Sequence, residues 1–343
     1  MTLQTTWFFL WGLLWAIFFM TEGFDFGVGT LLPFLGKTDE EKRMMIHSIG
    51  PIWDGNEVWL ITAGGVTFAA FPKVYAVMFS SLYSALMLIL FALILRGVSF
   101  EFRGKVENPG WRKIWDMCSF LGSALPALLF GVAFANIFEG IPIDQNGIYH
   151  GNLFTLLNPY GLCGGVLFLL LFVQHGALWL SIKTQGDLQH RAIHTANRLW
   201  PLSVAVAVVF LIFSKFATRL YSNYLTHPAF FLVILLTVLA LLGIKYYLKR
   251  QQYGMAWIAS AVTIVGATFF GVIGLFPDLF PSSINPSFSL TAFNASSSPL
   301  TLTIMLCVVI VFIPIVLIYQ AWTYRLFRSK TTSDDLIYDE GYY

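Results

Sequence analysis

The chain has 343 residues, of which 57% are hydrophobic and 11% are charged, with a mean hydropathy of +0.73 and a net charge of +2. A soluble domain carries about 25% charged residues. A chain with so few charged residues suits the hydrocarbon core of a membrane, because charges there are not hydrated. The composition therefore predicts an integral membrane protein, and the lack of basic runs interleaved with aromatic residues argues against a nucleic-acid partner.

Neither the cysteines nor the N-terminus adds a processing or metal signal. Cys118, Cys163 and Cys307 lie in separate apolar stretches and form no CxxC pair, so disulfide, zinc and iron–sulfur sites are not predicted. The first apolar stretch begins at Trp7, and no Lys or Arg precedes Lys37. It lacks the charged region of a signal peptide, so we expect a retained first helix.

Nine stretches are long and apolar enough to span a bilayer, which requires roughly 20 residues each. They cover about residues 7–35, 51–72, 74–101, 114–138, 157–182, 199–218, 228–248, 255–277 and 300–325. The second is the least apolar, because Asp54, Glu57 and several glycines lie in its first half. We expect an all-α membrane protein whose nine transmembrane helices form two four-helix bundles and one peripheral helix.

The basic residues give this arrangement an orientation. With nine spans, the segments 36–50, 96–113, 183–198, 245–254 and the C-terminal tail share one side of the membrane. Those segments hold 17 of the 20 Lys and Arg residues. The positive-inside rule then predicts an N-terminus outside and a C-terminus in the cytoplasm. Residues 1–330 form a single polytopic domain in this scheme, and 331–343 form an acidic cytoplasmic tail.

Acidic side chains inside spans are candidates for function, because lipid leaves them unsolvated. Asp25 lies 18 residues beyond Trp7, about 27 Å along a helix, in the inner half of the bilayer. Asp54 and Glu57 share one face at the start of the second span. Together with Glu101 and Asp116, near the inner ends of the third and fourth spans, they make up the candidate proton pathway.

Two interpretations compete for these acids. A hydrated route from the cytoplasm would use the carboxylates as a relay, whereas a structural role would have them cap helices or pair with Arg96, Arg103 or Arg112. We favour ion pairing for Glu101 and Asp116, since an interfacial acid costs little. For Asp25 we favour the relay, because no Lys or Arg lies on its own span. Asp54 falls between the two.

Histidine gives little support for haem in this chain. Only His175 lies well inside a span, and bis-histidine haem needs a second imidazole facing the first. We therefore expect His175 to pack with one hydrogen bond, and any haem to belong to another subunit. No catalytic, cofactor-binding or metal-binding residue is predicted here.

At GFDFGVG (23–29) and WDGNEVWLITAGG (53–65) the chain closely resembles subunit II of the cytochrome bd-type quinol oxidases. Further matching stretches are AAFP (69–72), RGVSFEFR (96–103), WRKIWD (111–116), GNLFTLLNPYGL (151–162), PSSINPSFSLTAFNASSSPLTL (281–302) and YQAWTYRLF (319–327). The resemblance runs from the first helix to the last and leaves only the acidic tail uncovered.

The resemblance implies a multi-pass protein of the bacterial cytoplasmic membrane and a role in respiration. Enzymes of this family oxidise a quinol, reduce O₂ to water and build a proton gradient with protons from the cytoplasm. Two b-type haems and haem d sit in subunit I, which pairs with subunit II, often beside a small single-span subunit. Subunit II is haem-free, with its motif acids at Asp25 and Asp54, and in some members it holds a structural quinone; lipid is a further expected partner.

Two other functions stay open on the sequence alone. A proton-coupled secondary transporter could use Asp25 as its coupling carboxylate, although the paired broken helices of such proteins are not evident. A purely structural assembly partner would need its buried acids only for packing.

Overall fold

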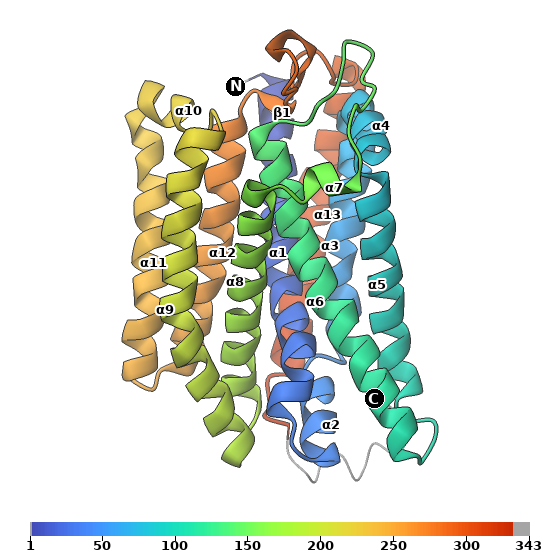
Figure 1. Ribbon diagram of the computed structural model, residues 1–343, viewed down its shortest axis with the longest axis vertical. Helices are drawn as coiled ribbons and strands as arrows, with labels where there is room; N and C mark the ends of the chain where they lie inside the picture. Colours follow the sequence, from blue (N-terminus) through green and yellow to red (C-terminus); the bar gives the residue numbers. More distant parts are fainter. Residues whose placement is uncertain (1, 332–343) are drawn as a thin grey trace.

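A computed structural model of the protein describes residues 2–331, and the described chain is built almost wholly of helices (Figure 1). The longer helices are α1 (Leu3–Leu35), α3 (Trp53–Ala70), α5 (Tyr83–Phe102), α6 (Pro109–Glu139), α8 (Pro159–Lys183), α9 (Gly186–Ala217), α11 (Phe231–Lys249), α12 (Tyr253–Leu275) and α13 (Pro299–Leu326). The shorter helical elements are α2 (Asp39–His47), α4 (Pro72–Ser81), α7 (Leu153–Leu156), α10 (Tyr221–Thr226), η1 (Pro228–Phe230) and η2 (Pro286–Phe288). Most of the predicted acidic tail, 332–343, lies outside the described residues.

The helices run between two ends of the molecule, here called the α2 end and the β1 end (Figure 1). The α2 end holds α2 and the connections that follow α5, α8 and α11. The β1 end holds the start of α1 and the segment 277–299, in which strand β1 (Asp278–Phe280) pairs antiparallel with β2 (Leu290–Thr291). This segment is tied to the loop after α6 by a bond from the Ile141 amide to the Pro281 carbonyl (2.9 Å).

Eight helices of the described chain are long and apolar enough to cross a membrane: α1, α5, α6, α8, α9, η1 with α11, α12 and α13. The predicted second span, α3, is not among them, because Asp54, Asn56 and Glu57 make its first turns polar. It is nevertheless bonded near both ends to α13 or to the segment directly before α13. Ser297 bonds the carbonyl oxygens of Ala69 and Ala70 at one end, and Gln320 meets Trp59 at the other.

The predicted third span, 74–101, is wrong as a single helix: it is divided at Leu82 into α4 and α5. Near the break, the Ser80 hydroxyl donates to the Ala76 carbonyl at 2.7 Å, a local bond that bends helices. Pro72 starts α4 at a position where a missing N–H costs nothing. The assignment of nine spans to two bundles and one peripheral helix stays a prediction.

Helix α1 lies at the centre of the molecule and packs against α3, α6, α8 and α12 (Figure 1). Its closest neighbour is α8, because two glycines meet at the crossing. A Cβ placed on Gly27 would lie 2.0 Å from the Phe172 carbonyl oxygen, and one placed on Gly176 would lie 2.5 Å from the backbone of Gly27 and Val28. This approach fixes the height of α1, and hence of its acidic residues, relative to the other helices.

We expect Gly27→Ala to destabilise the protein by about 1–3 kcal/mol, the usual cost of overpacking. The added methyl would press on the α8 backbone, which cannot turn aside as a side chain can. The measurement is the thermal unfolding midpoint of the purified complex. Gly243→Ala in α11 is the matched control, because its Cβ would meet nothing closer than 3.7 Å. Equal midpoints for the two variants would contradict the close crossing.

Candidate functional site: a buried carboxylate cluster

A fully buried arginine lies between carboxylates from two other helices. Arg96 of α5 is ion-paired with Glu22 of α1, and both side chains are 0% exposed. Its Nη2 also contacts Glu57 Oε1 of α3 at 2.9 Å, and the Glu57 side chain is 22% exposed. The guanidinium carbon lies 4.7 Å from the ring centre of Phe26 and 5.9 Å from that of Trp53. Aromatic faces thus attract the part of the cation that carboxylates leave uncovered.

Asp25 lies one turn from Glu22 on α1 and is also 0% exposed. Its Oδ2 accepts a hydrogen bond from Asn56 Nδ2 at 2.7 Å, and its Oδ1 has no hydrogen-bond partner among the described residues. The other end of the Asn56 amide, Oδ1, accepts from the Tyr324 hydroxyl at 2.8 Å. Asp25 is therefore held by a neutral amide and not by a cation.

The cluster has more acids than bases. Glu22, Asp25 and Glu57 face the single guanidinium of Arg96. Burying two uncompensated negative charges would cost far more than binding a proton. Asp25 is the acid of this cluster that has no direct cation partner among the described residues.

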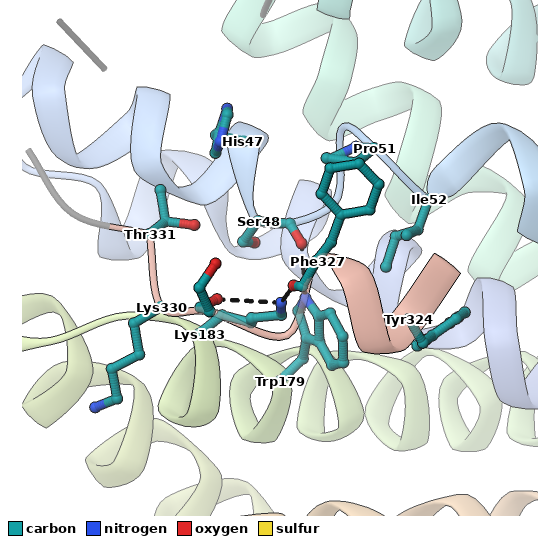
Figure 2. A pocket seen from close by; sticks show the side chains of 11 residues that line it. His47, Ser48, Pro51, Ile52, Trp179, Lys183, Tyr324, Phe327, Lys330 and Thr331 are labelled. Carbon is teal, nitrogen blue, oxygen red and sulfur yellow. Dashed lines mark hydrogen bonds between the residues drawn. The ribbon is translucent and has the colours of Figure 1, made fainter. Parts of the chain in front are cut away.

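A cavity of about 330 Å³ lies at the α2 end and is bordered by Tyr324, the residue that bonds Asn56 of the cluster. Its walls include His47, Trp179, Lys183, Tyr324 and Phe327 (Figure 2). The Lys183 ammonium donates to the Phe327 carbonyl and holds the end of α13 against α8. Because Tyr324 both lines the cavity and bonds Asn56, its side chain joins the cavity to the hydrogen-bond network of Asp25.

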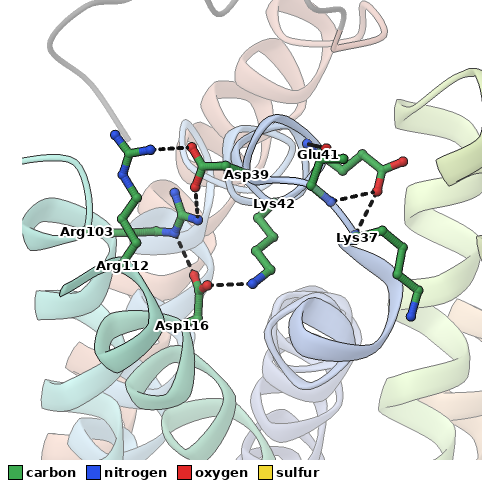
Figure 3. A network of polar contacts seen from close by, with 8 residues as sticks. Lys37, Asp39, Glu41, Lys42, Arg103, Arg112 and Asp116 are labelled. Atoms are coloured by element: carbon green, nitrogen blue, oxygen red, sulfur yellow. Dashed lines mark hydrogen bonds and ion pairs between the residues drawn. The ribbon is translucent and has the colours of Figure 1, made fainter. Parts of the chain in front are cut away.

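A second charged network lies at the α2 end and is separate from the buried cluster (Figure 3). Asp116 contacts Arg103 Nε at 2.6 Å and Lys42 Nζ at 2.8 Å. Asp39 contacts Arg103 and Arg112, at 2.7 and 2.8 Å. These bonds fasten α2 to the ends of α5 and α6. Asp116 therefore takes part in the ion pair with Arg103 that the sequence suggested, and its role in proton transfer stays a prediction.

The opposite side of α2 carries another carboxylate, Glu41, which is tied to its neighbours. Burial alone would raise the pKa of Glu41, but hydrogen bonds from Arg191 and the backbone N–H of Lys37 lower that pKa below its usual range. The Glu41 carboxylate accepts from the Lys37 amide at 2.7 Å (Figure 3). It is thus a charged anchor of the helix start.

The candidate acids end up in different places. Asp25 and Glu57 are brought together around Arg96, whereas Asp54 and Glu101 are exposed on the surface of the described chain. Glu22 of α1, which is not among the candidate acids, is the main counter-ion of Arg96. Asn56 and Tyr324 were not anticipated, although both lie inside motifs (WDGNEVW and YQAWTYRLF) that would have drawn attention to them.

A family model described as cytochrome bd terminal oxidase subunit II matches residues 3–327. The chain is 40% identical to a probable cytochrome oxidase subunit 2 from Haemophilus influenzae, over 92% of this chain and 93% of that protein. It is 38% identical to cytochrome bd ubiquinol oxidase subunit 2 from Bacillus subtilis (96% and 97%) and 36% identical to cytochrome bd-I ubiquinol oxidase subunit 2 from Escherichia coli K12 (97% and 96%).

The chain belongs to the cytochrome bd terminal oxidase subunit II family. Its fold agrees, since the bd oxidase from Geobacillus thermodenitrificans has a chain that superimposes with a TM-score of 0.78 at 16% identity, over 95% of this chain and 99% of that one. Family membership makes the protein a multi-pass subunit of a respiratory oxidase in the inner membrane. Between the enzyme and transporter interpretations, it favours the enzyme.

Because the family implies haem in the complex, His175 was the residue to test for ligation. Its Nε2 lies 3.2 Å from the Met20 carbonyl oxygen. Its ring stacks on Trp257, with ring centres 5.2 Å apart and planes 8° apart. Within residues 2–331, no three His, Cys, Asp or Glu side chains gather as metal ligands would. The stacked ring and the single Nε2 contact agree with the expected packing role of His175, and Nδ1 is buried without a hydrogen-bond partner among the described residues.

We expect Arg96→Met to cost about 3–5 kcal/mol of stability, because it leaves buried carboxylates without their counter-ion. Adding Glu22→Gln should restore part of that loss, since Glu57 is partly exposed and can be hydrated. Unfolding midpoints of the purified complexes measure both effects.

Arg112→Met is the control for this comparison. It removes a contact between side chains that are 33% and 40% exposed, which is worth about 0–1 kcal/mol. A double variant no more stable than Arg96→Met would refute the charge balance described for the cluster.

Proposed function

We propose that this chain is the haem-free subunit II of a complex that oxidises a quinol and reduces O₂ to water, and that it carries a proton route from the cytoplasm through Asp25. The observation that carries the proposal is the position of Asp25. It is a fully buried carboxylate held only by an amide, in a cluster with three acids and one base. Reduction of O₂ consumes protons, and such a residue can accept and release one.

The proposed orientation puts the α2 end in the cytoplasm. The positive-inside rule supports it, because the connections that carry most Lys and Arg gather at this end. The cavity lined by Tyr324 then opens toward the proton source. In this scheme all nine predicted spans cross the membrane, α3 included. Protons from the cytoplasm would enter the cavity and pass from there toward Asp25 in the interior of the protein.

The remaining acids have graded roles in this proposal. Glu57 lies between the buried ion pair and the exposed side of α3, next to the surface proposed to meet a neighbouring subunit. Asp54, exposed three residues earlier, would contribute from the same side once the partner covers it. Glu101, exposed nearer the α2 end, would collect protons there, whereas Asp116 is paired with Arg103 and Lys42 and has a structural role in this proposal.

The proposed partner is subunit I, which would hold two b-type haems and haem d, with a small single-span subunit as a further member. In this proposal the partner covers apolar side chains that are exposed on α3 and α5. They include Ile61 at 74%, Phe68 at 61% and Phe91 at 56%. An apolar crevice of about 800 Å³ between α3, α5 and α6 has the chemistry to take a lipid tail or an isoprenoid quinone.

We expect Asp25→Asn to slow steady-state O₂ reduction by about tenfold or more, since a positioned proton carrier contributes at least that much. Haem spectra of the purified complex should stay unchanged, because the variant keeps the shape of the side chain and alters no haem contact in this subunit. Oxygen consumption with an excess of quinol is the measurement.

Asp187→Asn at the exposed start of α9 is the control, and its turnover should equal that of the unmodified enzyme. Full turnover in Asp25→Asn would refute the proton route. Loss of the haem signals in the same variant would instead point to the purely structural role.

A further inference from the structure

A directed chain of hydrogen bonds ends on Asp25. The indole Nε1 of Trp59 donates to Gln320 Oε1 at 3.0 Å. The amide nitrogen of Gln320 lies 3.3 Å from Asn56 Oδ1 and 3.4 Å from the Gly55 carbonyl oxygen. Asn56 Nδ2 in turn donates to Asp25 Oδ2 at 2.7 Å. Helices α3 and α13 thus build a line of two amides between an indole and a carboxylate.

The direction of this line is set by groups that cannot reverse their roles. An indole N–H is a donor only, and a backbone carbonyl is an acceptor only. A flipped Gln320 would point its NH₂ at the Trp59 N–H and its oxygen at the Gly55 and Asn56 oxygens. Both arrangements repel, so Gln320 is locked with its nitrogen toward Asn56.

The lock on Gln320 passes to Asn56. Since Asn56 Oδ1 receives the Gln320 NH₂ and the Tyr324 hydroxyl, its own NH₂ has to face Asp25. An N–H that points at a carboxyl group favours the ionised form of that group. A protonated Asp25 Oδ2 would present a hydrogen to the Asn56 NH₂ and would require the amide to turn over.

We propose that Trp59 and Gln320 are positioning residues that set the proton affinity of Asp25 by fixing the direction of the Asn56 amide. This inference rests on the proposed proton-carrying role of Asp25. The charged and titratable groups around Asp25 are Glu22 on α1, Glu57 on α3, Arg96 on α5 and Tyr324 on α13. Of these, Tyr324 can accept as well as donate, so it permits either direction of Asn56 and leaves the choice to Gln320.

The test is an infrared pH titration of the intact complex, in which the protonated carboxyl band of Asp25 is identified by its loss in Asp25→Asn. Trp59→Phe keeps an aromatic ring but removes the N–H, and Gln320→Leu removes the next donor. Each should move the midpoint of the band upward by roughly 0.5–1 pH unit, the effect of one neutral hydrogen bond. The pH profile of O₂ reduction should shift in the same direction.

Non-additivity is the sharper criterion. Because both residues act through Asn56, the Trp59→Phe/Gln320→Leu double variant should shift no further than the larger single shift. Trp15→Phe is the matched control, since the Trp15 indole N–H is buried without a hydrogen-bond partner in the described chain; its midpoint should equal that of the unmodified complex.

The outcomes separate the two claims. A band that titrates in the unmodified complex but keeps its midpoint in both single variants overturns the positioning role and leaves the proton route intact. A midpoint shift of the same size in Trp15→Phe also overturns it. If no titrating band is lost in Asp25→Asn, the proposed function itself fails.

Discussion

The structure depends on one buried positive charge. A guanidinium without counter-ions inside a bilayer is costly, so the position of Arg96 on α5 dictates what may lie beside it. Glu22 on α1 and Glu57 on α3 meet that demand, and the rings of Phe26 and Trp53 cover the rest. Ion pairs therefore align α1, α3 and α5 at the level of Arg96. The close glycine contact between α1 and α8 fixes the position of α1 along its axis.

Hydrogen bonds, more than apolar packing, attach α13 to the other helices. Only Leu302 of this helix is buried, yet α13 is held at both ends. Near the β1 end, the Trp7 indole donates to the Leu302 carbonyl at 3.0 Å. Near the α2 end, Gln320 and Tyr324 bond α3. In a membrane, where apolar surfaces gain little from meeting each other, such bonds and close contacts decide helix position.

The sequence predicts the helical membrane class, most span positions and the burial of Asp25, because those properties follow from composition and from residues along one helix. It does not predict partners on other helices. Arg96 lies about 70 residues from Glu22 in the chain, so no spacing rule pairs them. Asp54 and Asp25 both fall inside predicted spans, and the sequence alone does not show that Asp54 is exposed and Asp25 buried. The sequence does not predict the break at Leu82, because a continuous apolar stretch gives no signal for a bend. The hydrogen bond of Ser80 to the backbone becomes visible only in the structure.

Arg96 and Asp25 have complementary tasks within the cluster. An arginine stays protonated under all physiological conditions. Its permanent positive charge is compensated by the carboxylates of Glu22 and Glu57. Asp25 receives no such charged partner, and its side chain is bonded only by an amide whose direction is set by hydrogen-bond geometry. A site that must exchange protons needs this division, because a carboxylate paired directly with a guanidinium holds its negative charge too firmly to take up a proton. Asp25, which Arg96 does not bond, is therefore the acid of the cluster proposed to change its protonation state.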